Sequence, residues 1–278
     1  MEKSLPTPAA SATAQHRLSG LAASGALHKA LRTLATIGVI LAIWELVARL
    51  FFPPYILPPP TLVVAAFGKI IADGTLPKHL QISLGRAVIG FLLAAALAIP
   101  LGMLTAWWKV LDDTVGSALE LLRPIPSLAL IPLAIVWLGF GEVSKITLIT
   151  YACFFSIYVN THAGVRNVDP LYIKVLKIYG NGTRDILTKV VMYSMLPYVF
   201  TGLRYSAAVA LILLVAVELV GAQAGLGFYL TQTQAFFLVP EMFATITVFG
   251  LLGFLANLLI LYVERRVIKW RQAVGAEF

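Results

Sequence analysis

Residues 86–108 read Arg-Ala-Val-Ile-Gly-Phe-Leu-Leu-Ala-Ala-Ala-Leu-Ala-Ile-Pro-Leu-Gly-Met-Leu-Thr-Ala-Trp-Trp. After the arginine this stretch is almost entirely apolar. An α-helix rises about 1.5 Å per residue, so about 20 apolar residues cross a hydrocarbon core about 30 Å thick. Further segments share this character: 31–52, 119–140, 144–165, 202–222 and 243–263. The sequence therefore predicts an all-α membrane protein with six transmembrane helices.

The composition of the whole chain supports this class. Of its 278 residues, 59% are hydrophobic and 12% are charged, whereas a soluble domain carries about 25% charged residues. This balance excludes an ordinary soluble enzyme and a disordered protein. Cys153 is the one cysteine in the sequence, so an intrachain disulfide and a cysteine-based metal site are excluded as well.

The apolar segments define one transmembrane domain over residues 29–272. Residues 1–28 are rich in Ala, Ser and Leu and lack an apolar core of signal-peptide length. We interpret them as a disordered cytoplasmic tail, with a cleaved targeting segment as the alternative. Residues 273–278 are expected to form a short cytoplasmic C-terminal tail.

Lysine and arginine residues set the expected orientation, because they accumulate on the cytoplasmic side of membrane proteins. With the N-terminus inside, the inner pieces are the tail to residue 32, then 109–118, 164–204 and 264–278. Of the 21 Lys and Arg residues, these pieces hold fifteen (four, one, six and four), and the outer pieces hold four. Both termini are therefore predicted to be cytoplasmic. We attribute the net charge of +8 to this topology rather than to nucleic-acid binding.

Two connections between spans have a distinct character. The outer connection, 53–85, opens with five prolines, which stop a helix, and residues 61–72 then form an amphipathic pattern typical of a short surface helix. The inner connection, 166–201, is long, basic and helical in pattern. A long ordered loop of this kind indicates either a docking site for a partner or an ordinary solvated connection between two spans.

Several polar or helix-breaking residues lie inside the predicted spans. Pro124, Pro126 and Pro132 interrupt the third span, and the broken helix either suits the wall of a solute path or only improves packing. The carboxylate of Glu218 is costly in an apolar helix, and it either braces an outer gate against backbone N–H groups near Gly225 and Gly227 or is satisfied structurally. The candidate solute-path residues are Ser127, Pro126, Asn160 and Glu218.

Opposite charges at helical spacing predict ion pairs across one turn. His162, at the end of the fourth span, is interpreted as a satisfied interfacial histidine rather than a cavity residue. No catalytic residue and no metal site is expected in this chain. The predicted pairs are Glu45 with Arg49, Glu120 with Arg123, and Asp185 with Lys189.

The inner loop carries a recognisable motif. It reads Lys174-Val175-Leu176-Lys177-Ile178-Tyr179-Gly180, followed by Val190 and by Leu196-Pro197. This resembles the EAA loop of permease subunits in bacterial ABC importers, in which Glu-Ala-Ala precedes a glycine and, nine residues later, an isoleucine and Leu-Pro. Lys174-Val175-Leu176 replaces Glu-Ala-Ala, and Met192-Tyr193 stands where Leu-Pro is expected.

Further blocks narrow the resemblance to the sulfonate, taurine, nitrate and bicarbonate group of these permeases, over about residues 30–272. The resemblance implies a type I importer permease in the bacterial inner membrane, which works as a dimer with two ATPase subunits and a periplasmic solute-binding protein. The blocks are Ser83 to Arg86, Leu122 to Ser127, Ile131 to Leu133, Leu138 to Glu142, Asn160 to Pro170, Thr201 to Arg204 and Gly221 to Gly227.

The resemblance also implies that loop 166–190 couples this chain to its ATPase. Gly180 is placed to end the loop helix in the left-handed conformation that glycine adopts without strain. The basic Lys174 reverses the charge of the family's glutamate, so a salt bridge made there in relatives is reversed or absent here. The candidate coupling residues are Lys174, Val175, Leu176, Gly180, Asn181 and Gly182.

The sequence contains no GxxxxGK[ST] phosphate-binding loop, so ATP hydrolysis is assigned to a separate subunit. No cofactor is expected in this chain, and ATP and Mg²⁺ would be bound by the partner ATPase; besides the protein partners, only membrane lipid is expected to contact it. The leading function is transport of a small, anionic solute. An ion-coupled secondary carrier and a non-transporting membrane scaffold are the alternatives. Purification would distinguish the importer from both, because an ATPase co-purifies with an importer permease.

Overall fold

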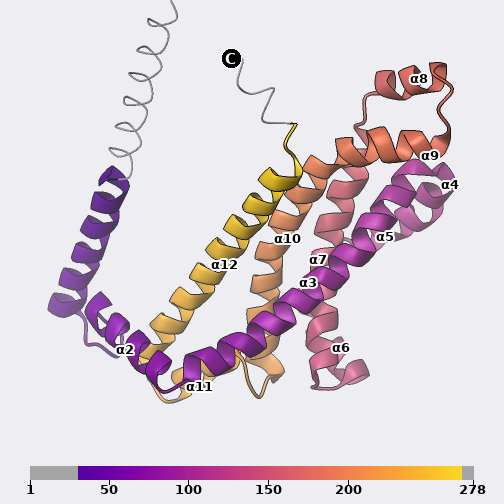
Figure 1. Ribbon diagram of the computed structural model, residues 1–278. Helices are drawn as coiled ribbons and strands as arrows, with labels where there is room; N and C mark the ends of the chain where they lie inside the picture. The colour runs from indigo at the N-terminus through magenta and orange to yellow at the C-terminus, as the bar shows by residue number, and fades with distance from the viewer. Residues whose placement is uncertain (1–30, 271–278) are drawn as a thin grey trace, which may run out of the picture. The chain divides into compact units, whose positions relative to one another are not determined.

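The computed structural model describes residues 31–270 of the chain (Figure 1). These residues are predominantly helical, and no strand occurs among them. The chain divides into two compact units, Met1–Ala65 and Ala66–Phe278. The predicted tails, 1–28 and 273–278, lie outside the described residues.

The first unit contains the helix Leu31–Phe51 and the start of α2 (Pro60–Ala72). The predicted pair is present, since Arg49 Nε donates to Glu45 Oε1 at 2.5 Å. The Thr61 N–H donates to Glu45 Oε2 at 3.1 Å, and Arg49 Nη2 donates to Thr61 Oγ1 at 3.0 Å. The pair therefore ties the end of the first helix to the start of α2 across the proline turn. The helix predicted at 61–72 is confirmed to within one residue, and its position at the outer membrane surface stays a prediction.

The second unit is built on four long helices, α3 (Thr75–Trp107), α7 (Glu142–Arg166), α10 (Met192–Gly221) and α12 (Val239–Val267). Helix α7 packs against both α3 and α10, and α12 packs against α10. In Figure 1, α8 lies at the opposite end of this unit from α6 and α11. The shorter elements are α4 (Lys109–Leu111), π-turn η1 (Asp112–Gly116), α5 (Ser117–Leu122), 3-10 turn η2 (Ser127–Leu130), α6 (Ile131–Leu138), α8 (Pro170–Ile178), α9 (Thr183–Ile186), π-turn η3 (Leu187–Val191) and α11 (Leu226–Ala235).

Small residues along α3 let it approach α7 closely. Gly90, Ala94, Ala98 and Gly102 recur every four residues and so lie on one face of the helix. A Cβ atom on Gly90 would lie 2.7 Å from Ile149 Cγ2, and Ala94 and Ala98 are fully buried. Such small-residue stripes are typical of helix pairs in membranes, where close backbone approach replaces a hydrophobic driving force.

Within residues 31–270, five helices are long and apolar enough to cross a membrane, and six if one bent pair counts as a single span. The bent pair corrects the predicted span at 119–140. It consists of Lys109–Leu122 and Ser127–Leu138, inclined by 81°. Pro126 has no N–H to donate to the Leu122 carbonyl, so the ladder stops there. That carbonyl instead accepts from the Ile125 N–H and the Tyr151 hydroxyl, both at 3.1 Å.

Two other helices begin well before the spans predicted within them. Helix α3 starts at Thr75 rather than at residue 86, and the helix predicted at 202–222 extends from Thr183 to Gly221. Residues 183–190 of the predicted loop 166–190 therefore belong to this long helix. For α3, hydropathy places the start too late because the added turns contain polar side chains, such as His79 and Ser83, that are buried and bonded within the protein.

Candidate functional site

A cavity of about 550 Å³ lies among α5, η2, α7 and α10. Two of the predicted solute-path residues, Ser127 and Asn160, line it together. The lining combines one cationic side chain with hydroxyl, amide and apolar groups, and it contains no carboxylate. Its residues are Arg123, Ile125, Ser127, Ala152, Phe155, Ser156, Val159, Asn160, Thr201, Tyr205 and Val209.

The helical repeat explains how these polar groups converge. Ser156 and Asn160 are four residues apart on α7, and Thr201 and Tyr205 are four apart on α10, so each pair shares one helix face. Asn160 Nδ2 donates to the Ser156 carbonyl at 2.8 Å, which fixes the amide against its own helix. The break after α5 brings Ser127 to the same cavity. The sequence identified Ser127 and Asn160 by their polarity, but not Thr201 or Tyr205.

The other two candidates do not line this cavity. Pro126 creates the break that positions Ser127. The Glu218 side chain is 0% exposed, and its Oε2 accepts the Gly227 N–H at 2.8 Å. The contact with a backbone N–H near Gly227 is therefore confirmed, and the geometry places Glu218 in a buried brace rather than on the cavity surface.

Arg86 is the centre of this brace, which sequence reasoning missed. It is 4% exposed, and its Nη1 donates to Glu218 Oε1 at 2.7 Å. Its Nε and Nη2 donate to the two carboxylate oxygens of Glu142 at 2.5 and 2.6 Å. Lys145 lies 3.5 Å from the Glu142 carboxylate, so two cations balance two anions. The sequence did contain a signal, because three of the blocks that resemble the permease family, Ser83–Arg86, Leu138–Glu142 and Gly221–Gly227, meet at this brace.

The loop after α10 closes onto this brace through its backbone. The Leu226 N–H donates to Ser83 Oγ at 2.7 Å, and the Gly225 N–H donates to His79 Nδ1 at 3.0 Å. Gly225 has φ 122°, and a Cβ atom there would lie 2.4 Å from Glu218 Oε1. A residue with a side chain is therefore excluded at this position by both conformation and space.

A second polar group holds α11 to α12. Lys69 Nζ donates to Glu241 Oε1 at 3.0 Å, and the Tyr229 hydroxyl lies 3.4 Å from Glu241 Oε2. Burial, with the nearby Glu241 carboxylate, raises the pKa of Tyr229 to about 12. The hydroxyl therefore keeps its proton and donates to Glu241. The hydrogen bond with Glu241 also raises the pKa of Lys69.

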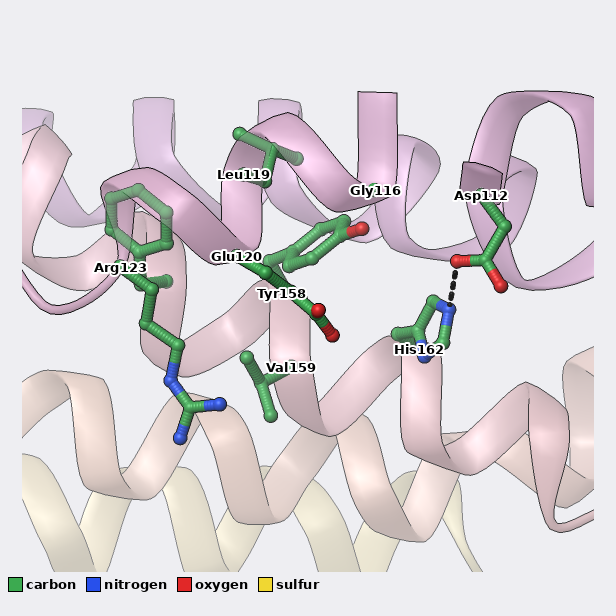
Figure 2. Close-up of a pocket in the computed structure, with 9 residues that line it drawn as sticks. Asp112, Gly116, Leu119, Glu120, Arg123, Tyr158, Val159 and His162 are labelled. Atoms are coloured by element: carbon green, nitrogen blue, oxygen red, sulfur yellow. Dashed lines mark hydrogen bonds and ion pairs between the residues drawn. The ribbon is translucent and has the colours of Figure 1, made fainter. Parts of the chain in front are cut away.

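A smaller pocket of about 60 Å³ lies between η1, α5 and α7 (Figure 2). His162 Nε2 lies 2.9 Å from Asp112 Oδ1, and Arg166 forms an ion pair with the other oxygen of Asp112. His162 therefore has a hydrogen-bonding partner, as predicted, but it also lines this small pocket, which the prediction had excluded. The predicted pair of Glu120 with Arg123 is not formed between these two described residues, because Arg123 lies at the C-terminal end of α5 and its side chain points away from Glu120.

Helix α8 is capped at both ends. Its N-cap, Asp169, accepts the Leu171 N–H at 2.8 Å, and Pro170 occupies the first turn. At the C-terminus the Gly180 N–H donates to the Lys177 carbonyl and the Asn181 N–H to the Leu176 carbonyl, both at 3.0 Å. This is a Schellman motif. Gly180 has φ 75°, so its predicted left-handed conformation is confirmed.

The predicted coupling residues divide between two faces of α8. Lys174 and Val175 are exposed, whereas Leu176 is partly buried against the cluster around Val165 and Ile186. Asn181 Nδ2 also donates to the Leu176 carbonyl, at 3.2 Å. Gly182 precedes α9 as its N-cap. The outward face of α8 and its C-cap carry further large apolar side chains, all exposed: Leu171, Tyr172, Ile178 and Tyr179.

Helices long enough to cross a membrane, a polar cavity among them and an exposed helix at one end define a membrane transport protein. The chain belongs to the family of binding-protein-dependent transport system inner membrane components, which it matches over residues 98–269. It is the permease subunit of an ABC importer and an integral inner-membrane protein, and it works with a binding protein and an ATPase. ATP hydrolysis occurs in the separate ATPase subunit, and the family excludes the secondary-carrier and scaffold alternatives.

Similar proteins support this assignment. A Bacillus subtilis protein, SsuC, carries the name of an aliphatic sulfonates transport permease and is 36% identical over 84% of this chain and 86% of its own length. The taurine transport system permease protein TauC of Escherichia coli is 33% identical over 87% of this chain and 90% of its own. A solved structure of the MetNI methionine ABC transporter, in inward-facing form, matches with a TM-score of 0.60 at 18% identity, over 71% of this chain and 96% of that chain. The structural match concerns the fold alone.

Proposed function

We propose that this permease moves a small anionic solute of the sulfonate class through the cavity lined by Ser127 and Asn160. The observation that carries the proposal is the cavity itself. Its volume is about 550 Å³, which accommodates a solute of a few heavy atoms together with water. Hydroxyl and amide groups from α7, η2 and α10 line it, and such groups hydrogen-bond to the oxygen atoms of an anion.

The sulfonate class is supported by the names of the relatives. SsuC of B. subtilis is named for aliphatic sulfonates and TauC of E. coli for taurine. Both kinds of solute carry a sulfonate group. Nitrate and bicarbonate are the other small anions that the family resemblance suggests. The absence of any carboxylate from the cavity lining favours this anionic group over cationic solutes, which a carboxylate would attract.

Helix α8 is the proposed docking element for the ATPase. Capping at both ends lets this nine-residue helix keep its shape although only Ile173 and Leu176 pack against the core. Large exposed apolar side chains on a short helix are typical of an interface. Closure of the ATPase on ATP and Mg²⁺ would push on α8 and, through the Schellman turn, on the long helix Thr183–Gly221.

The assembly we propose contains two copies of this permease and two ATPase subunits. A second copy that faces the cavity would enclose the solute between the two chains. Both termini and α8 are cytoplasmic in this arrangement, and the binding protein delivers solute at the end that holds α6 and α11. The charge distribution along the sequence supports this orientation.

The proposal is tested in two independent steps with the intact importer. In proteoliposomes supplied with ATP and the binding protein, the wild-type complex is expected to take up labelled ethanesulfonate. Failure of uptake would contradict the sulfonate class. Separately, Ile178→Asp is expected to reduce co-purification of the ATPase, because Ile178 is 82% exposed on the proposed interface.

Phe236→Asp is the matched control for this docking test. Phe236 is an exposed apolar residue in the loop after α11, at the end of the unit opposite α8. The Phe236→Asp substitution should leave the amount of co-purified ATPase unchanged. Equal ATPase recovery with Ile178→Asp and Phe236→Asp would contradict docking at α8.

A further inference from the structure

We infer that Arg123 binds the anionic group of the solute and so selects anions in the cavity. This inference rests on the solute path proposed above. Arg123 is the cationic residue among those that line the cavity, and the lining contains no acidic residue. The side chain therefore supplies the positive charge there, against hydroxyl and amide groups that carry no net charge.

No carboxylate among residues 31–270 forms an ion pair with Arg123. Arg86, Arg166 and Arg204 each have a carboxylate within 4 Å. In the described part of the chain no such carboxylate lies beside Arg123, and Glu120, one turn earlier, does not pair with it (Figure 2). Arg123 is exposed, so its guanidinium is open to a bound anion, which would supply the counter-charge that the chain does not.

The backbone at Arg123 is fixed while its side chain is free. The Arg123 N–H donates to the Leu119 carbonyl at 2.9 Å, and Tyr151 holds the next carbonyl, that of Leu122, at 3.1 Å. Pro124 and Pro126 restrict the chain that follows. The guanidinium therefore projects from a rigid point at the helix break, which limits the entropy lost when it binds a ligand.

Free hydroxyl donors complete the site. Ser127 and Tyr205 line the same cavity, and among the described residues neither hydroxyl forms a hydrogen bond. A guanidinium presents two parallel N–H groups that match two oxygens of a sulfonate or carboxylate. Arg123 with two hydroxyl donors can thus bind three oxygens of one anionic group.

Arg123 also lines the small pocket that contains Asp112, Glu120 and His162. It lies where that pocket and the large cavity adjoin, because Phe155 and Val159 line both as well. Glu120, which carries the opposite charge, lines the small pocket but not the large cavity. This placement makes Glu120 a matched control residue, on the same helix as Arg123 but outside the large cavity.

The test measures ethanesulfonate taken up per ATP hydrolysed by the complete importer in proteoliposomes, with saturating loaded binding protein. This ratio is normalised to assembled, active complex, so a purely structural defect does not lower it. Arg123→Met is expected to lower the ratio about tenfold or more, since hydrogen bonds to a charged partner are lost. Arg123→Lys keeps the charge without the two-pronged geometry, and about a threefold loss is expected. Glu120→Gln should match the wild type.

An unchanged ratio in Arg123→Met overturns the inference and makes Arg123 a residue that only reaches toward the membrane interface. Equal losses in the Lys and Met variants also overturn it, because charge would then not matter. If Arg123→Met does not assemble, Arg123→Lys decides, and an unchanged ratio there overturns the contact. In each of these cases the wild type still transports ethanesulfonate. Absence of uptake by the wild type instead contradicts the proposed function, and the inference with it.

Discussion

Arg86 and Glu218 form a buried ion pair, with Arg86 Nη1 2.7 Å from Glu218 Oε1, that joins α3 to the end of α10. Their side chains are 4% and 0% exposed. Ser83, Arg86 and the Gly227 N–H together donate to both oxygens of Glu218. A carboxylate with this many donors is fully satisfied, so the pair fixes the loop that follows α10 rather than serving as a site for solute.

Removal of one partner from this pair should destabilise the protein strongly. Glu218→Gln leaves Arg86 with Glu142 alone, and Arg86→Met leaves both Glu142 and Glu218 without their bridging cation. The loss of one member of a buried pair costs about 3–5 kcal/mol. We expect lower thermal stability in detergent for both variants, measured by size-exclusion recovery after heating, with Arg86→Met the more severe.

Glu45→Gln provides the control for this prediction. In the Glu45–Arg49 pair the Arg49 side chain is 61% exposed and the Glu45 side chain 23%, and ion pairs open to solvent contribute little to stability. Its melting temperature should stay close to that of the wild type. If Arg86→Met and Glu45→Gln had the same melting temperature, the buried pair would have no stabilising role.

Close packing of α3 on α7 predicts opposite effects for two glycines of one helix. A Cβ atom on Gly90 would meet Ile149 Cγ2 at 2.7 Å, whereas nothing lies within 4 Å of one on Gly85. Gly90→Ala should cost about 1–3 kcal/mol through overpacking. Gly85→Ala should be neutral or stabilise by up to about 1 kcal/mol, because alanine favours helix. Thermal unfolding of both variants checks this, and equal effects would contradict the packing argument.

The sequence predicted the long helices well where a helix is apolar along its whole length. The segment 243–263 lies inside the observed α12, Val239–Val267. The sequence-based prediction of a helix start failed where polar residues form hydrogen bonds inside the protein, as His79 and Ser83 do in the first turns of α3. Hydropathy measures each residue against water or lipid and does not register a hydrogen bond to Gly225 or Leu226.

The same limit applies to the site. Ser127 and Asn160 were identifiable because single polar residues stand out beside a proline break or at a span's end. Arg86 was counted among charges outside the membrane because a sequence count assigns any cation at a span's end to the adjoining loop. Its partners, Glu142 and Glu218, lie 56 and 132 residues away, so only the folded chain brings the three together.

The orientation of the chain can be tested by cysteine labelling. The native Cys153 is buried with 0% exposure, so the wild type should remain unlabelled. Gly74 and Gly182 both lie in exposed turns with open space around them. Gly74 has φ 77°, where a cysteine is strained, so normal membrane insertion of Gly74→Cys is verified by its expression level before labelling. In intact cells a membrane-impermeant maleimide should label Gly74→Cys and not Gly182→Cys. The reverse pattern would contradict cytoplasmic placement of the termini and α8.

Gly180 and Gly182 offer a matched pair for the coupling turn. A Cβ atom added at either position would have open space within 4 Å, but Gly180 has φ 75° and Gly182 has φ −77°. Gly180→Thr places a β-branched residue in the left-handed region, at a cost of about 1–3 kcal/mol, and so should reshape the end of α8. Gly182→Thr supplies a favourable N-cap to α9 instead. We expect about tenfold weaker ATPase co-purification and uptake for Gly180→Thr, with normal membrane insertion, and wild-type behaviour for Gly182→Thr. Normal ATPase recovery and uptake in Gly180→Thr would mean that this turn only connects two helices.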